Sequence, residues 1–275
     1  MIAALIIVFR EVLEAGLIVG IVAAVTRGLA HNRQWIGGGV LAGVIGSCVV
    51  AAFVGTLAAT FGGSGHEIFD ASILAVAVVM LAWHNIWMAR HGRIMAAELK
   101  AAGQAVVSGS STMFGLAVVV AVAVLREGSE VVLFLTGIAV SQSVSGLSMI
   151  AGGLFGLILG AIASSLTYSG LLVVPARYLF TVTSLLIAFL AAGMAAQAVA
   201  LLEQGGIIDF LSSTVWNTSH ILPDGSIPGR VLHTLLGYSD RPSVMQLLVY
   251  LVTIGTILLL MRVLAPRSAP KARAA

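Results

Sequence analysis

The sequence IAALIIVFREVLEAGLIVGIVAAVT, residues 2–26, decides the fold class. It is an apolar run that three charged residues interrupt: Arg10, Glu11 and Glu14. A helix of this length can cross the ~30 Å hydrocarbon core of a bilayer. No basic segment precedes the apolar run, so we interpret it as a retained membrane-spanning helix and not as a cleaved signal peptide.

The composition of the whole chain leads to the same class. Of its 275 residues, 59% are hydrophobic and only 9% are charged, whereas soluble domains carry about 25% charged residues. A soluble fold is therefore excluded. The net charge of +3 fits basic cytoplasmic loops, and we expect no nucleic acid partner. The single cysteine, Cys48, can form no disulfide within the chain.

Further apolar runs predict an all-α integral membrane protein that forms one polytopic domain over residues 1–275. Backbone polar groups in lipid must find partners within their own segment, so we expect these runs to be helical. The seven predicted membrane-spanning helices cover residues 2–26, 36–61, 68–89, 113–140, 147–172, 178–203 and 245–264. We expect residues 205–244 to form short helices on the outer membrane surface, and residues 265–275 to form a basic cytoplasmic tail.

The distribution of charge predicts the orientation. Ten basic residues fall in the connections on one side of the predicted membrane, against only Arg230 and Arg241 on the other side. Basic residues are enriched on the cytoplasmic side, so the N-terminus is predicted outside and the C-terminus inside. The outer connections have a net charge of −4. This charge would attract cations, although it also follows simply from the exclusion of basic residues from translocated loops.

The charged pattern of residues 10–14 occurs a second time. Residues 126–130 read Arg-Glu-Gly-Ser-Glu, so the pattern R-E-x-x-E returns 116 residues after its first occurrence. Each repeat unit contains three predicted helices, so the second unit enters the membrane with the opposite polarity. We therefore predict an inverted repeat of residues 2–89 and 113–203, an architecture typical of secondary transporters with a central binding site.

The two motifs place four carboxylates and two guanidinium groups inside the membrane. On a helix the two glutamates of each motif share a face, and Arg10 or Arg126 can pair with one of them. Each charged residue at the bilayer centre costs about 2.5–3.5 kcal/mol. A clamp between two helices is one explanation for this cost. The net charge of −2 favours a second explanation, a bound cation, and carboxylate ligands suit Mg²⁺, Ca²⁺, Mn²⁺ and ionic iron.

At these residues the chain resembles the oxidase-dependent iron permease family, which includes fungal high-affinity permeases and bacterial EfeU-type ferrous iron permeases. The resemblance rests on REVLEAGLIV and REGSEVVLF, on the FDAS segment that opens the third helix, and on LLGYSDRPSV before the seventh. It implies iron transport, with Glu11, Glu14, Glu127 and Glu130 as ligands and Arg10 and Arg126 as their partners. The family usually has glycine after R-E, so Val12 predicts a less close helix approach in the first copy.

Other residues are secondary candidates. Glu67, Asp70 and Glu203 lie at predicted outer helix ends, where they could recruit ions or simply complement helix termini. His84 lies near the predicted inner end of its helix and is a candidate exit ligand, although a polar side chain at the membrane interface is also ordinary there.

The resemblance also implies partners and a location. They are an extracytoplasmic oxidase or peroxidase and an iron-binding protein, in the bacterial cytoplasmic membrane, with iron as substrate and no prosthetic group. Glycines spaced four apart indicate close packing within the chain or in a homo-oligomer. Two other functions stay open: a proton-coupled exchanger that uses the Arg and Glu pairs, and a metal-dependent intramembrane transferase. The protein is predicted to be a transporter and not an enzyme.

Overall fold

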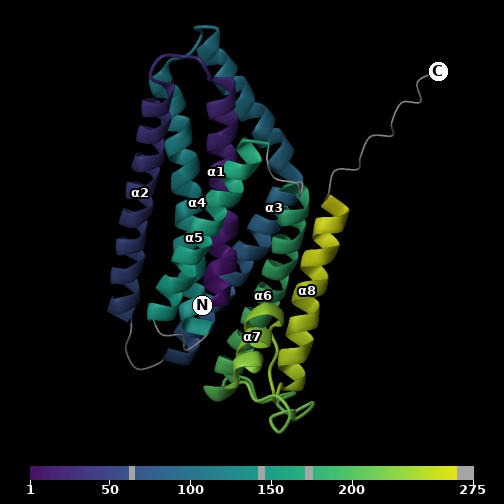
Figure 1. The fold of residues 1–275 in the computed structure, drawn as a ribbon. Coiled ribbons are helices and arrows are strands. Elements are labelled where there is room, and N and C mark those ends of the chain that lie inside the picture. Colours follow the sequence, from purple (N-terminus) through teal and green to yellow (C-terminus); the bar gives the residue numbers. More distant parts are fainter. Residues whose placement is uncertain (62–65, 142–145, 171–175, 265–275) are drawn as a thin grey trace, which may run out of the picture.

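The computed structural model describes residues 1–61, 66–141, 146–170 and 176–264, and this part of the chain is a bundle of helices (Figure 1). No strand occurs in the described ranges, where Thr214 and Ser243 form an isolated bridge. The helices are α1 (Ile2–Val25), α2 (Asn32–Phe61), α3 (His66–Val107), α4 (Met113–Ser141), α5 (Gly146–Tyr168), α6 (Ala176–Gln204), α7 (Ile227–Leu236) and α8 (Val244–Leu264). The predicted all-α class is confirmed. The predicted tail, residues 265–275, lies outside the described residues.

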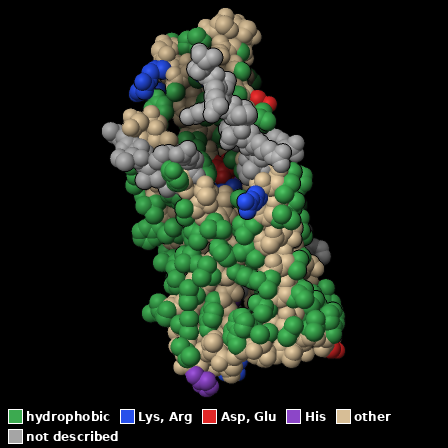
Figure 2. Space-filling model, turned by 90° about the vertical axis from the view of Figure 1, so that its right-hand side faces the viewer, with side chains coloured by type: hydrophobic (Ala, Val, Ile, Leu, Met, Phe, Trp, Pro, Cys, Tyr) green, Lys and Arg blue, Asp and Glu red, His purple; other side chains and the backbone are tan. Residues whose placement is uncertain are grey.

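Five of these helices are long and apolar enough to cross a membrane: α2, α3, α5, α6 and α8. The other two long helices, α1 and α4, each contain three charged residues in the R-E-x-x-E motif. Apolar side chains cover much of the face that Figure 2 shows. The protein is therefore a multi-pass integral membrane protein.

Helix α3 is much longer than the predicted segment 68–89. It has 42 residues, and at 1.5 Å per residue it is about 63 Å long, roughly twice the hydrocarbon thickness. The sequence AAELKAA at 96–102 consists of strong helix formers, so the helix continues where we expected a connection. Leu99 and Val106 of this extension are buried in one cluster with Ile18 and Val22 of α1.

Helix α5 packs closely against α1 because glycines face the backbone of α1. A Cβ atom added at Gly156 would lie 2.6 Å from the carbonyl oxygen of Leu5, and one added at Gly160 would lie 2.9 Å from that of Phe9. Gly152 is similarly close to the carbonyl of Met1. The glycines spaced four apart thus serve packing within the chain.

Helix α2 packs against α4 in the same way. A Cβ atom added at Gly39 would lie 2.5 Å from the carbonyl oxygen of Ala117, and one added at Gly43 would lie 2.7 Å from that of Ala121. One turn further, the Ser47 hydroxyl donates to the Leu125 carbonyl at 3.4 Å. Gly43 faces the carbonyl of Ala121, and Gly156 faces the carbonyl of Leu5. Ala121 follows Leu5 by 116 residues, and the same number of residues separates the two motifs.

The substitution at Val12 does not loosen the first helix pair, contrary to our expectation. In the second copy Gly128 faces Ser47 of α2. In the first copy the glycine stands on the partner helix: a Cβ atom added at Gly160 of α5 would lie 2.9 Å from the Cβ of Val12. One small residue per contact is enough for close approach, so the glycine can belong to either helix.

The main core lies between the motifs and the lower end of the bundle in Figure 1, where the N-terminus and α7 are found. It consists of buried side chains from α1, α3, α4, α6 and α8: Ala3, Ile7, Ala71, Leu74, Ala77, Leu81, Phe134, Ile138, Ile187, Ala188, Leu190, Ala191, Met194, Ala198 and Ile257. We call this set the lower core.

Residues 205–244 include one short helix, α7. The Ser226 hydroxyl caps the start of α7 by accepting from the Gly229 amide, and Gly237 ends it with a left-handed φ of 68°. Asp224 and Asp240 exchange hydrogen bonds, since each carboxylate accepts from the backbone amide of the other residue. Burial raises the pKa of Asp224.

Candidate metal centre

The first R-E-x-x-E motif is completely buried on α1. Arg10, Glu11 and Glu14 are 1%, 1% and 3% exposed. The Arg10 guanidinium lies between the two carboxylates, with Nη1 3.3 Å from Glu11 Oε1 and Nε 2.9 Å from Glu14 Oε1. One positive charge is thus shared by two carboxylates that water does not reach. The two carboxylates can therefore also bind a further cation.

The second motif has the same internal pairing on α4 but a different environment. Arg126 Nε lies 3.1 Å from Glu130 Oε1, while Glu127 is 2% exposed. The Arg126 side chain is 36% exposed, and its guanidinium stacks 4.2 Å above the Trp87 ring of α3. The two motifs are therefore equivalent in sequence but not in solvation.

A histidine from α3 completes the cluster. His84 is 3% exposed, and its Nε2 lies 3.8 Å from Glu11 Oε2 and 3.6 Å from Glu14 Oε2. Its Nδ1 contacts Glu130. Sequence analysis placed His84 on an exit path near the membrane interface, whereas the structure places it beside the motif glutamates.

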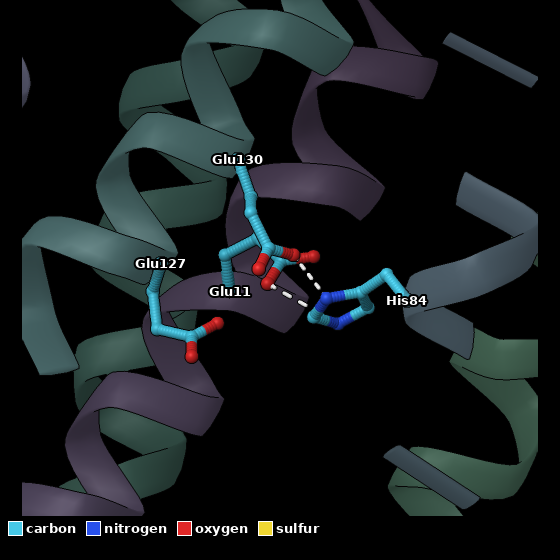
Figure 3. Close-up of side chains that lie close together, drawn as sticks. All are labelled: Glu11, His84, Glu127 and Glu130. Atoms are coloured by element: carbon cyan, nitrogen blue, oxygen red, sulfur yellow. Dashed lines mark ion pairs between the residues drawn. The ribbon is translucent and has the colours of Figure 1, made fainter. Parts of the chain in front are cut away.

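Four of these side chains could surround one ion. Glu11, His84, Glu127 and Glu130 each offer a ligand atom, and these four atoms lie within 4.8 Å of one another. Figure 3 shows the four side chains converging from α1, α3 and α4. Within the described part of the chain, one carboxylate oxygen each of Glu11 and Glu127 forms no hydrogen bond, while the second oxygen of Glu130 faces His84. Buried acceptors without donors are costly, and a cation would satisfy them.

Glu14 occupies a different place from the other motif glutamates. It lies beside Arg10 and His84, and it lines a cavity of about 430 Å³ together with Arg10 and Glu127. The remaining lining residues come from α1, α3, α6 and α8: Leu17, Ile18, Ile21, Met88, Met95, Ala96, Leu99, Phe180, Thr181, Ser184 and Met261. Figure 2 shows charged side chains at the bottom of a hollow in the upper half of the molecule.

The three acidic residues predicted at the entrance lie away from this cluster. Glu67 is exposed at the start of α3 and Asp70 is half-buried one turn later. Glu203 accepts hydrogen bonds from Ser243 and Gln246, both at 2.7 Å. Glu203 therefore attaches the end of α6 to the start of α8, a structural role that the sequence did not indicate.

The fold and the site together define a class: a multi-pass membrane protein with carboxylates from two helices buried at its centre. The chain belongs to the iron permease FTR1 family, whose model matches residues 1–268. Permeases are transporters and not enzymes, as the sequence predicted. No solved structure matches the chain significantly.

Several curated proteins are similar over nearly the whole chain. A ferrous iron permease EfeU from Yersinia pestis is 30% identical over 266 residues, which cover 95% of this chain and 93% of the relative. The protein of that name from Yersinia pseudotuberculosis is also 30% identical, with 95% and 92% covered. The one from Escherichia coli O6:K15:H31 is 30% identical over 250 residues, 90% of each chain.

Proposed function

We propose that this protein is an iron uptake permease that binds iron with the glutamates of its two R-E-x-x-E motifs. The observation that carries the proposal is the convergence of Glu11, Glu127 and Glu130 on one buried point. Glu14 serves as a fourth carboxylate on the cavity side. The relatives are named ferrous iron permeases, which supports iron as the cargo.

The arginines hold the carboxylates in place and limit the depth of the site. Arg10 contacts both glutamates of its motif, and Arg126 contacts Glu130. Four carboxylates and two guanidinium groups leave a charge of −2, which a divalent cation neutralises. An ion that must leave again cannot be bound too tightly, so partial compensation by arginine suits transport better than an uncompensated site.

We propose seven membrane-spanning helices, α1 to α6 and α8, with the N-terminus outside. Two three-helix units, residues 2–89 and 113–203, form an inverted repeat in one polytopic domain. The matching register of the α1–α5 and α4–α2 contacts supports this arrangement. Inverted repeats place the substrate near the membrane midplane, which agrees with a site built from α1 and α4.

The described conformation faces inward in this topology. The cavity of about 430 Å³ is lined by the second half of α1 and the first residues of α6, which point to the predicted cytoplasmic side. The lower core closes the opposite side. Iron would enter past Glu67, Asp70 and Glu203 after a rearrangement of this core, and it would leave through the cavity.

The remaining expectations follow from the family. We propose a location in the bacterial cytoplasmic membrane, with an extracytoplasmic oxidase or peroxidase and an iron-binding protein as partners. Homo-oligomer formation would use apolar faces other than those of Gly39, Gly43, Gly156 and Gly160, which are occupied within the chain.

Uptake of Fe²⁺ into proteoliposomes tests the proposal. We expect Glu14→Gln and Glu130→Gln each to reduce uptake at least tenfold, because loss of even a supporting group at a metal site typically costs 10–100-fold. Glu98→Gln is the matched control, since Glu98 is exposed on the extension of α3. Unchanged uptake in both motif variants would refute the ligand assignment. Transport that depends on pH but not on metal would favour the proton-coupled exchanger instead.

A further inference from the structure

His84 has an unusual environment for a buried histidine. Its ring is 3% exposed, and both ring nitrogens contact carboxylate groups and no backbone acceptor within the described residues. A structural histidine in a core normally donates to a fixed backbone or side-chain acceptor. Here the groups that face the two nitrogens are carboxylates of Glu11, Glu14 and Glu130, and these are the proposed ligands of the cargo.

Packing fixes the ring in this position. The rings of His84 and Phe134 of α4 lie edge to face, with centroids 6.2 Å apart and planes at 79°. The next residue, Asn85, is 0% exposed, and its side-chain amide donates to the Ser184 carbonyl of α6 at 2.9 Å. This bond attaches α3 to α6 beside the ring. Contacts to α4 and α6 therefore position His84 in the site, while both of its nitrogens face the motif carboxylates.

We infer that His84 is a ligand of the transported ion and that its nitrogen gives the site a preference for Fe²⁺ over Mg²⁺ and Ca²⁺. The inference rests on the proposed function and adds a ligand that comes from neither motif. The ion then contacts three helices, α1, α3 and α4, instead of two.

The geometry allows this coordination. Two ligands on opposite sides of an ion with bonds of ~2.1 Å lie about 4.2 Å apart, and the four candidate atoms already lie within 4.8 Å of one another. Small side-chain rotations would close this gap. His84 belongs to this set of four, whereas Glu14 does not.

The ligand chemistry determines the preference. Carboxylates alone suit Mg²⁺, Ca²⁺ and Mn²⁺, whereas imidazole suits iron, zinc, copper and nickel. Mg²⁺ also gives up its water reluctantly and is seldom held in a site made of protein ligands alone. One imidazole among carboxylates therefore raises the affinity for Fe²⁺ more than the affinity for Mg²⁺ or Ca²⁺. A site with this imidazole therefore suits Fe²⁺ better than a site made of carboxylates alone.

The alternative is a histidine that only balances charge, and the two roles differ in bonding. A ligand forms a bond from nitrogen to the metal, whereas a counter-ion does not. X-ray absorption at the iron edge of the anaerobic, Fe²⁺-loaded protein distinguishes them, because a coordinated imidazole gives a characteristic outer-shell scattering pattern. We expect one imidazole per iron in the unmodified protein. We expect none in His84→Gln, and one in His220→Gln, a control in which an exposed loop histidine is replaced.

A competition series gives a second readout. The ratio of Fe²⁺ to Mg²⁺ binding, measured in one sample of purified protein, does not depend on the fraction of folded molecules. We expect His84→Gln to reduce this ratio at least tenfold and His220→Gln to leave it unchanged.

Absence of imidazole from the iron spectrum of the unmodified protein would overturn the inference, and this result needs no variant to fold. An unchanged ratio in His84→Gln would overturn it as well. In both cases the proposal that glutamates bind the iron remains supported if Glu130→Gln abolishes iron binding. Failure of the unmodified protein to bind iron at all would instead refute the proposed function.

Discussion

Replacement of the two motif arginines should have unequal effects on stability, although the sequence makes them equivalent. Arg10 is 1% exposed and contacts two buried carboxylates. The Arg126 side chain is 36% exposed and contacts one carboxylate and the Trp87 ring. Arg10→Gln removes the partner of two buried charges, whereas Arg126→Gln removes a partly hydrated pair.

The magnitudes follow from these environments. Removing one partner of a buried ion pair costs about 3–5 kcal/mol, because the remaining charge is left uncompensated. A solvated pair contributes about 0.2–1 kcal/mol, and the stacking of Arg126 on Trp87 adds about 0.5–1 kcal/mol. For a chain of this size 1 kcal/mol shifts Tm by roughly 2–4 °C. Arg10→Gln should therefore lower Tm by roughly 6–20 °C, and Arg126→Gln by less than about 8 °C.

Thermal unfolding of both variants in detergent, with and without Fe²⁺, measures the difference. Fe²⁺ should recover part of the loss in Arg10→Gln, because the ion supplies positive charge next to Glu11. Equal shifts in the two variants would refute the reasoning from burial. A larger shift in Arg126→Gln would contradict the conclusion that Arg10 is the arginine in the more buried ion pair.

Three other perturbations test the packing, the outer segment and the cavity. Gly43→Leu should destabilise the protein by about 1–3 kcal/mol in thermal unfolding, because a Cβ atom at this position would lie 2.7 Å from the Ala121 carbonyl oxygen. Gly37→Leu is the control and should not destabilise it, because the space around Gly37 is open. Equal effects of the two substitutions would contradict the α2–α4 contact. The raised pKa of Asp224 means that the folded segment binds a proton more readily than the unfolded one, so its stability should fall as pH rises through that raised pKa. Hydrogen exchange of residues 205–244, corrected for intrinsic rates, should show this slope and lose it in Asp224→Asn, and a slope that survives in that variant would assign it to another group. In a Cys48→Ala background, Ser184→Cys, which lines the cavity, should react with an impermeant maleimide from the cytoplasmic side only, and Ala188→Cys in the lower core should not react; labelling from the outside would contradict an inward-facing state.

The class of fold could be predicted from the sequence because lipid imposes strict rules on composition. Long apolar runs predict helices, and both R-E-x-x-E motifs were visible as charges inside such runs. The length of α3 was not predicted. Hydropathy marks the part of a helix in lipid and not its continuation into water, which depends on helix propensity and on contacts such as that of Leu99 with α1.

The position of His84 was also missed, for a different reason. Its neighbours in sequence, Trp83 and Asn85, suggest a membrane interface. The buried residues Leu74, Ala77 and Leu81 precede His84 at helical spacing, so the histidine lies on the buried face of α3. That spacing was present in the sequence and could have placed His84 toward the core. Its distance from the motifs depends on how α3 packs against α1 and α4, which no local pattern specifies.

The central claim is that iron binds where the two motifs meet. Anomalous scattering at the iron edge from crystals loaded with Fe²⁺ tests it most directly. We predict one strong peak within bonding distance of Glu11, Glu127 and Glu130, on the side that His84 faces. Iron peaks elsewhere in the protein, with none among these carboxylates, would contradict the account.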